Sequence, residues 1–272
     1  MAIFAKLAYR EGAELLPLLA TRFVVAGGLL VAYHVAIRRR LWIGRRDVVR
    51  LMLLGALGYA TESALFFLGL ERAPAAVISL IFFTYPMWTA LLAYATGRER
   101  YTHRTLVALL LGTGGVAFIF SVRVESLAGP LFALAAAVAV AVYLLVAQVV
   151  VARIDASVVA TWTALGAAVA VAAGTVVSRS AIPRGALDEA VGLGAASAVA
   201  FVLLIRAIAL IGSARAAVAS MLEPVATVVL AALLLDESIT LRVVLGAVLV
   251  VSALPVLATS PPVADSPAPA GP

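Results

Sequence analysis

Four charged side chains stand inside long apolar runs of the sequence, namely Arg22, Glu62, Arg206 and Glu223. If those runs cross a membrane, a charge near the middle of one costs roughly 2.5–3.5 kcal/mol, so each charge needs a reason to be there. In membrane proteins such groups bind solutes or ions, carry protons, or pair with one another. These four residues are therefore the first candidates for chemistry.

The two carboxylates each allow two interpretations. Glu62 lies near the middle of its run, where it could face a cavity and bind a cationic solute or carry a coupling proton. It is equally suited to pair with an Arg or to hydrogen-bond a neighbouring helix. Glu223 directly precedes Pro224, which frees backbone carbonyls, so a substrate-site role and a local structural role both stay open.

The two arginines favour structural roles. Arg206 could hold a carboxylate or phosphate through two parallel hydrogen bonds, but it lies close to a helix end and the sequence slightly favours a side chain that extends to the interface. Arg22 lies about two turns into its run, and pairing with another protein group is favoured over contact with a solute.

Two prolines and three aromatic residues complete the set of candidates. Pro86 and Pro224 are predicted to kink their helices and to leave carbonyl groups unpaired where a cavity could use them. Tyr59, Tyr85 and Trp88 are candidates to line that cavity, although each alone is at least as well explained by packing in lipid or at its interface.

Composition identifies the elements that must position these residues. Of the 272 residues, 64% are hydrophobic and 12% are charged, and the mean hydropathy is +1.13. That is too apolar for a soluble domain, and the long apolar runs lack the alternation of a membrane β-barrel. We therefore predict an all-α integral membrane protein. The net charge of +6 comes from Arg clusters between the runs, which is typical of topology signals and not of a nucleic-acid surface.

Nine apolar runs are long enough to span a bilayer. They cover 15–37, 49–70, 74–96, 104–121, 130–150, 156–178, 190–211, 215–235 and 242–260. Residues 1–9 are expected to be the last turns of a further, incomplete helix. The Pro-rich segment 261–272 is predicted to be a disordered tail.

An internal repeat relates the two halves of the chain at a spacing of 138 residues. The matched pairs include Pro86 with Pro224, Thr89 with Thr227, and Glu99 with Glu237. The ancestral unit then has five helices, and an odd number of spans forces the second unit to enter the membrane upside down. We predict two inverted five-helix repeats, at 1–123 and 128–260.

Orientation follows from the distribution of Lys and Arg in the short loops. The side that holds the loop 38–50 carries 11 of them and the other side carries seven. The Arg-rich side and the C-terminus are therefore predicted to be cytoplasmic.

The residues resemble the EamA-type branch of the drug/metabolite transporter superfamily, which is built from two five-helix repeats. The second-repeat pattern of this family is matched at 216–250 by AAVASMLEPVATVVLAALLLDESITLRVVLGAVLV, and a weaker copy lies at 75–115. The family's Lys near the end of helix one and Arg in helix two correspond to Lys6 and Arg22. The resemblance implies a secondary transporter, commonly an exporter of metabolites or amino acids.

The sequence argues against an intramembrane enzyme. Every Asp lies in an expected loop or the tail, His34 and His103 are peripheral, there is no Cys, and no nucleotide-binding P-loop is present. We expect no cofactor and no metal. The expected partners are the lipid bilayer and a small-molecule solute, with a homodimer left open and nucleic acid excluded. A non-transporting membrane assembly or receptor protein is the alternative function.

Overall fold

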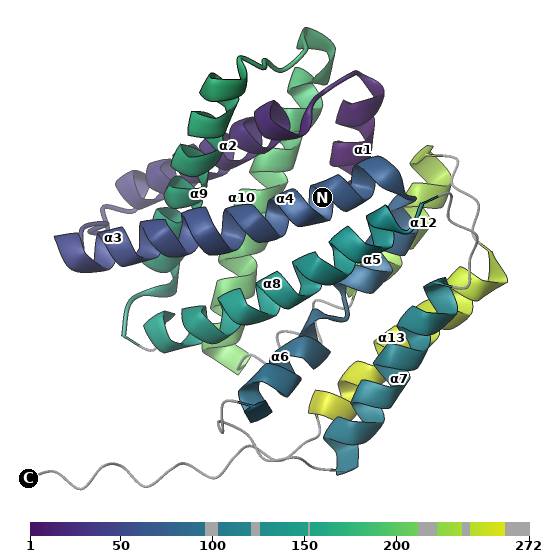
Figure 1. Ribbon diagram of the computed structural model, residues 1–272. Coiled ribbons are helices and arrows are strands. Elements are labelled where there is room, and N and C mark those ends of the chain that lie inside the picture. Colours follow the sequence, from purple (N-terminus) through teal and green to yellow (C-terminus); the bar gives the residue numbers. More distant parts are fainter. Residues whose placement is uncertain (96–102, 121–125, 152, 212–221, 236–239, 259–272) are drawn as a thin grey trace, which may run out of the picture.

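The computed structural model describes residues 1–95, 103–120, 126–151, 153–211, 222–235 and 240–258, and these residues form helices joined by short connections (Figure 1). Within these ranges some helical residues, including Arg206 and Pro224, are described by their backbone alone. The helices are α1 (Ala2–Arg10), α2 (Leu15–Ala36), α3 (Arg45–Leu53), the π-helical segment η1 (Leu54–Tyr59), α4 (Ala60–Arg72), α5 (Ala75–Phe82), α6 (Tyr85–Ala95), α7 (His103–Phe120), α8 (Ala128–Val151), α9 (Ala156–Ser178), the 3₁₀ turn η2 (Arg184–Ala186), α10 (Leu187–Ile211), α12 (Leu222–Leu235) and α13 (Leu241–Ala258).

The predicted all-α class is confirmed, since the described residues contain helices and no strand. Five helical stretches among them are long and apolar enough to cross a membrane. These are Leu15–Ala36, Arg45–Arg72, Ala128–Val151, Ala156–Ser178 and Arg184–Leu204. The shorter stretches Ala75–Thr89 and Leu241–Ala253 are also apolar. The predicted tail at 261–272 lies outside the described residues.

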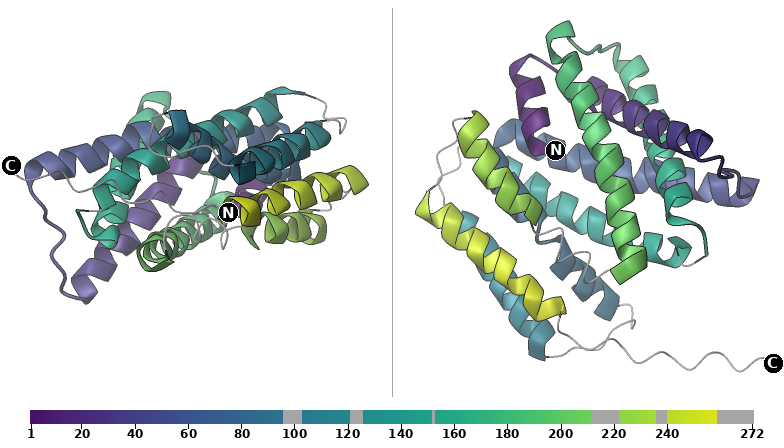
Figure 2. Two further views of the ribbon diagram at one scale, coloured as in Figure 1. Left: turned by 90° about the horizontal axis from the view of Figure 1, so that it is seen from below. Right: turned by 180° about the vertical axis from the view of Figure 1, so that it is seen from behind.

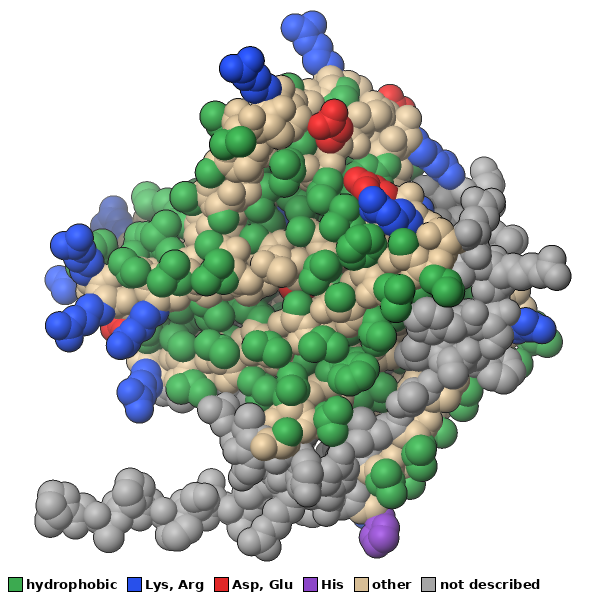
Figure 3. Space-filling model, viewed as in Figure 1, with side chains coloured by type: hydrophobic (Ala, Val, Ile, Leu, Met, Phe, Trp, Pro, Cys, Tyr) green, Lys and Arg blue, Asp and Glu red, His purple; other side chains and the backbone are tan. Residues whose placement is uncertain are grey.

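On the face shown in Figure 3, hydrophobic side chains cover most of the middle, and most of the Lys and Arg side chains lie at its edges. The arginines of the α2–α3 connection and of α3 are exposed at one end, while Arg72 and Arg179 are exposed where α4 and α9 end. An apolar band between two charged ends is the surface that a bilayer requires.

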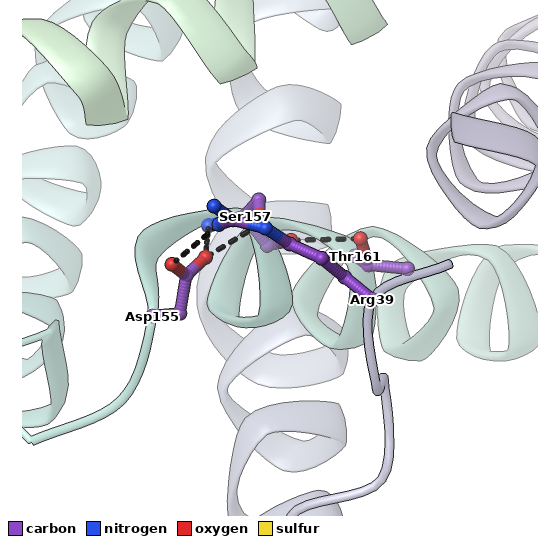
Figure 4. Close-up of polar contacts among 4 residues, drawn as sticks. All are labelled: Arg39, Asp155, Ser157 and Thr161. Carbon is purple, nitrogen blue, oxygen red and sulfur yellow. Dashed lines mark hydrogen bonds and ion pairs between the residues drawn. The ribbon is translucent and has the colours of Figure 1, made fainter. Parts of the chain in front are cut away.

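Helices at matching places in the two halves pack against each other in opposite directions. Leu16 of α2 lies near Gly174 of α9, and Gly27 of α2 lies near Leu165 of α9, so the two helices are antiparallel. At the end of this pair Arg39 meets Asp155, which caps α9 (Figure 4). In the same way α7 lies beside α13 (Figures 1 and 2).

The repeat spacing fits the later helices better than the earlier ones. Adding 138 to the bounds of α7 gives 241–258, which are the bounds of α13. The same shift applied to α2 gives 153–174, whereas α9 covers 156–178. The two halves therefore share an order of helices, and differences in the connections displace their register by a few residues.

Two of the predicted spans are not regular helices. The span at 49–70 contains the π-helical segment η1 between α3 and α4. The span predicted at 74–96 is divided, because α5 ends at Phe82 and α6 begins at Tyr85. Pro86 has no N–H to donate to the carbonyl of Phe82, and its ring opposes a continuous helix at this point.

Glycines allow two helix crossings that bring the core helices close together. A side chain at Gly55 would collide with the backbone of Thr163, so η1 approaches α9 at this point. A Cβ atom at Gly194 would lie 2.6 Å from the Cβ of Val25, so α10 approaches α2. Small residues serve this purpose in membrane helices because they let backbones meet.

Candidate functional site

The guanidinium of Arg22 is the centre of a buried polar network between three helical segments. Arg22 is 4% exposed and lies on α2. Its Nε atom donates to the Ser197 hydroxyl at 2.9 Å, Nη1 donates to the Ser63 hydroxyl at 3.2 Å, and Nη2 donates to the Tyr59 hydroxyl at 3.1 Å. Ser63 and Tyr59 belong to the first half of the chain and Ser197 to the second. The network therefore joins the two halves.

Aromatic rings surround the same guanidinium. Its Cζ atom lies 5.0 Å from the ring centre of Phe23, 5.2 Å from that of Phe67 and 5.6 Å from that of Tyr59. Within the described part of the chain, no carboxylate oxygen lies within 4.0 Å of the Arg22 nitrogens. Hydroxyl oxygens and ring faces thus stabilise the buried cation, and cation–π attraction is strongest where water is excluded.

Ser63 connects this cation to the buried carboxylate of Glu62. The Ser63 hydroxyl accepts from Arg22 and donates to Glu62 Oε2 at 3.1 Å. Glu62 is 7% exposed on α4. The two opposite charges are therefore linked through one neutral hydroxyl, and each could bind a group of a solute by replacing its contact with Ser63.

The close crossing at Gly194 explains why a serine of α10 reaches Arg22. Gly194 also approaches the backbone oxygen of Arg22 itself, and Ser197 lies about one helical turn further along α10. The Ser197 hydroxyl donates to the Leu193 carbonyl at 2.7 Å, which leaves its oxygen lone pairs to accept from the guanidinium.

Tyr59 extends the site into an aromatic stack. Its ring lies parallel to that of Phe201 with centroids 5.0 Å apart, and it stacks on Tyr143 at 5.9 Å. Phe23 meets Tyr59 edge to face at 5.2 Å. The stack brings together side chains of η1, α2, α8 and α10, and it gives the network one apolar wall.

Two more of the predicted residues, Glu223 and Tyr85, lie on α12 and α6. Glu223 is exposed in the first turn of α12. Tyr85 is buried against Phe82 and Phe83, 5.7 and 6.0 Å away between ring centres.

Trp88 makes no described contact with the network, and Arg206 and Pro224 are described by their backbone alone. Trp88 donates its indole N–H to the Thr84 hydroxyl at 3.2 Å. Arg206 belongs to α10 and Pro224 to the first turn of α12, but the side chains of both lie outside the described part of the chain. The structure thus brings Arg22, Tyr59 and Glu62 together and leaves Trp88 apart from them.

Ser63, Ser197 and Phe201 belong to the site but were not singled out from the sequence. Serine is common in membrane helices, and nothing in the sequence places residue 197 beside residue 22. The one sequence signal that could have indicated this contact is Gly194, because a glycine in an apolar helix marks a close approach of another backbone.

The site offers charges and hydroxyls that suit binding. Among the described residues, no group of three or more His, Cys, Asp or Glu side chains is arranged to hold a metal ion. A guanidinium beside a carboxylate and a set of hydroxyls can hold ionised and polar parts of a small molecule away from lipid.

Comparison with known proteins identifies the architecture. The family model described as "EamA-like transporter family" matches twice, at residues 1–121 and 127–259. None of the curated proteins compared with the chain matches it. A solved crystal structure is similar, with a TM-score of 0.70 and 20% sequence identity over 94% of this chain and 92% of its own. That likeness supports the fold alone, whereas the family model covers nearly the whole sequence. The chain is a multi-pass membrane protein and a member of the EamA-like transporter family, within the drug/metabolite transporter superfamily.

Proposed function

We propose that this transporter is a secondary, gradient-driven exporter of small metabolites or amino acids. The observation that carries the proposal is the buried Arg22 network, which joins α2 and α4 of the first half to α10 of the second. In transporters built from repeats, solutes bind near the middle of the membrane at the interface between the repeats. A buried, charged and hydroxyl-rich centre at such an interface matches that position.

Alternating access between two inverted repeats is the mechanism that this arrangement favours. The antiparallel pairing of α2 with α9 supports the inversion, because corresponding helices of inverted units run in opposite directions. During transport the two halves move relative to each other around the site. The hydrogen bond between Arg22 and Ser197 crosses from one half to the other, so it has to change in that movement.

The charges of the site define how a solute would bind. The Arg22 guanidinium suits a carboxylate or another anionic group, since its five N–H donors form a planar fork. Glu62 suits an ammonium group or a coupling proton. An amino acid carries both kinds of group, which is why amino acids head the list of solutes to test.

We place the protein in the plasma or inner membrane with its C-terminus in the cytoplasm. The excess of Arg on the side of the α2–α3 connection supports this orientation. A reporter domain fused after Ala270 is expected to be cytoplasmic, and an external reading would reverse the orientation proposed here.

Reconstitution tests the function directly. Purified protein in liposomes should exchange at least one labelled compound from a panel of the twenty standard amino acids and small organic acids. The Glu62→Gln variant should lose this exchange, and the matched surface variant Glu71→Gln should keep it, because Glu71 pairs with Arg72 where α4 ends. Exchange of no compound by the wild type would refute the proposal.

A further inference from the structure

The buried face of the helical stretch Arg45–Arg72 changes its register at η1. One row of buried residues runs along the stretch at steps of three or four, as the period of an α-helix requires, except for a single step of five. The row is Val48, Leu51, Gly55, Ala60, Ser63, Phe67 and Leu70. The step of five, from Gly55 to Ala60, is the π-helical turn, in which the Ala60 N–H donates to the Gly55 carbonyl. The stretch therefore holds one residue more than a regular helix with the same buried row would need.

That extra residue decides which side chains of α4 face Arg22. Ser63 and Phe67 lie one turn apart on the buried row, and both contact the Arg22 guanidinium. Glu62 is buried at the flank of the row. Each residue of a regular α-helix turns the chain by about 100°, so without the π-helical turn α4 would be rotated by one residue and Glu62 would take the place of Ser63. The guanidinium and the carboxylate, which Ser63 bridges in the structure, would then form a direct ion pair.

Close contacts with the second half of the chain hold this stretch in the observed register. Gly55 lies against the backbone of Thr163 on α9, and a Cβ atom at Gly69 would lie 3.1 Å from the Gly129 carbonyl oxygen of α8. In the regular register Leu68 would take the place of Gly69, and its side chain would press on the α8 backbone. The register can therefore change only when α8 moves away from α4. This condition couples the register of α4 to the relative movement of the two halves.

We propose that η1 is a register switch that exchanges Ser63 for Glu62 opposite Arg22 during transport. In the observed register a hydroxyl separates the two charges, and each can bind a charged group of the solute. In the regular register the two charges neutralise each other, which buried charges need when no solute accompanies them. The protein can then complete its cycle without solute. The inference rests on the proposed function, and it agrees with the frequent occurrence of π-helical turns at functional sites.

Deletion of Leu57 tests the switch, because it makes the helix regular without changing the buried row. Leu57 lies on η1 and is 73% exposed. After the deletion Ala60 follows Gly55 by four residues, so α4 keeps its observed register permanently. The assay uses proteoliposomes and the labelled amino acid of the panel that the wild type exchanges fastest. Exchange against the same amino acid outside should continue near the wild-type rate, whereas net efflux into a medium free of amino acids should fall by about tenfold or more.

Two further variants separate the length of the chain from the loss of a side chain. Leu57→Ala shortens the same side chain and keeps the length of η1, so exchange and net efflux should both match the wild type. Deletion of Ala56 removes a different residue of η1 and has the same effect on the register, so it should repeat the result of deleting Leu57.

The inference is overturned by net efflux at the wild-type rate in the deletion variants, by an equal loss of exchange and net efflux, or by a wild type that exchanges without net efflux. Failure of both deletion variants to insert in the membrane would also overturn it, because an unchanged buried row requires them to fold. A wild type that exchanges no amino acid would instead refute the proposed function for amino acids, and the switch with it.

Discussion

Two arginines of this chain show how burial changes the contacts that stabilise a guanidinium group. Arg22 is buried among three hydroxyls and three aromatic rings. Arg39 lies in the connection between α2 and α3, where its Nη1 atom is 3.4 Å from Asp155 Oδ2 and its side chain is 63% exposed. Only the exposed arginine has a direct carboxylate partner, yet water already solvates it. The formal ion pair is therefore the weaker of the two arrangements.

The comparison teaches that contacts with neutral groups matter most where water is excluded. A hydrogen bond to a charged group contributes about 1.5–3 kcal/mol when it is protected, whereas an exposed ion pair contributes about 0–1 kcal/mol. Substitution of Arg22 should therefore alter transport strongly, whereas substitution of Arg39 should have little effect on transport or stability.

The largest effect is expected for Arg22→Met. Methionine keeps an unbranched side chain of similar reach and removes the charge, so the helices can still pack. Removal of Arg22 alone leaves the buried Glu62 carboxylate and three hydroxyls without their cationic partner, so membrane abundance should also fall, and transport is compared at equal abundance. Transport should fall by about tenfold or more, because the hydrogen bonds between the halves and the solute's cationic partner are lost.

Arg22→Lys is the matched control for that variant. Lysine keeps the charge but cannot donate to Tyr59, Ser63 and Ser197 with one planar fork, so transport should be intermediate. Wild-type transport rates in the methionine variant, measured at equal abundance, would contradict the central role of Arg22.

The next largest effect is expected for Glu62→Gln. Glutamine preserves shape and can still accept from Ser63, so the substitution removes the charge and the proton site alone. A role in binding or coupling predicts normal abundance with transport lost, or with its pH dependence flattened. The measurement is exchange in proteoliposomes over a range of pH values. Unchanged transport across that range would assign Glu62 a structural role. Glu223 and Arg206 would then be the next candidates for binding or coupling.

The sequence predicted the long helices well, because the length of an apolar run directly indicates a membrane-spanning helix. The predicted span at 156–178 coincides with α9, and the one at 190–211 lies within α10. The sequence did not predict the π-helical segment at Leu54–Tyr59, which depends on local hydrogen bonding that hydropathy does not record. The kink predicted at Pro86 lies next to the division between α5 and α6, because the missing N–H of proline can be read directly from the sequence.

The candidate site was only partly accessible from the sequence. Arg22 and Glu62 stand out because a charge in an apolar run is rare. Ser63 and Ser197 do not stand out, and their importance arises from contacts across 41 and 175 residues of chain with Arg22. Such contacts depend on how the helices cross, which is a property of the packed molecule.

A smaller effect is expected for Asp155→Ala at the exposed end. Asp155 caps α9, since its carboxylate accepts from the backbone N–H of Ser157 at 2.9 Å (Figure 4). Loss of such a cap costs about 1 kcal/mol, so the thermal unfolding midpoint should fall by a few degrees without a large change in transport.

The charge of Asp155 adds a pH dependence to that effect. Hydrogen bonds from Ser157, and then the charge of Arg39, lower the pKa of the Asp155 carboxyl below its ordinary value. The stabilisation is therefore present at neutral pH and is lost as the pH falls through the lowered pKa of the folded state. Asp155→Asn keeps a good cap without the charge, so it should retain most of the stability at neutral pH and lack this acid-induced loss.

The smallest effect is expected for Arg39→Ala. This arginine is mostly exposed, and the α2–α3 connection is also held by the Trp162 indole N–H, which donates to the Leu41 carbonyl at 2.9 Å. The free energy of unfolding should change by about 0.5 kcal/mol or less, and added salt should not enlarge the difference. The measurement is the thermal unfolding midpoint at low and high salt, with Trp162→Phe as the variant that removes the competing contact. A destabilisation by Arg39→Ala as large as that of Asp155→Ala would mean that the ion pair, and not the helix cap, holds this end together, and the contrast between exposed and buried arginines would then fail.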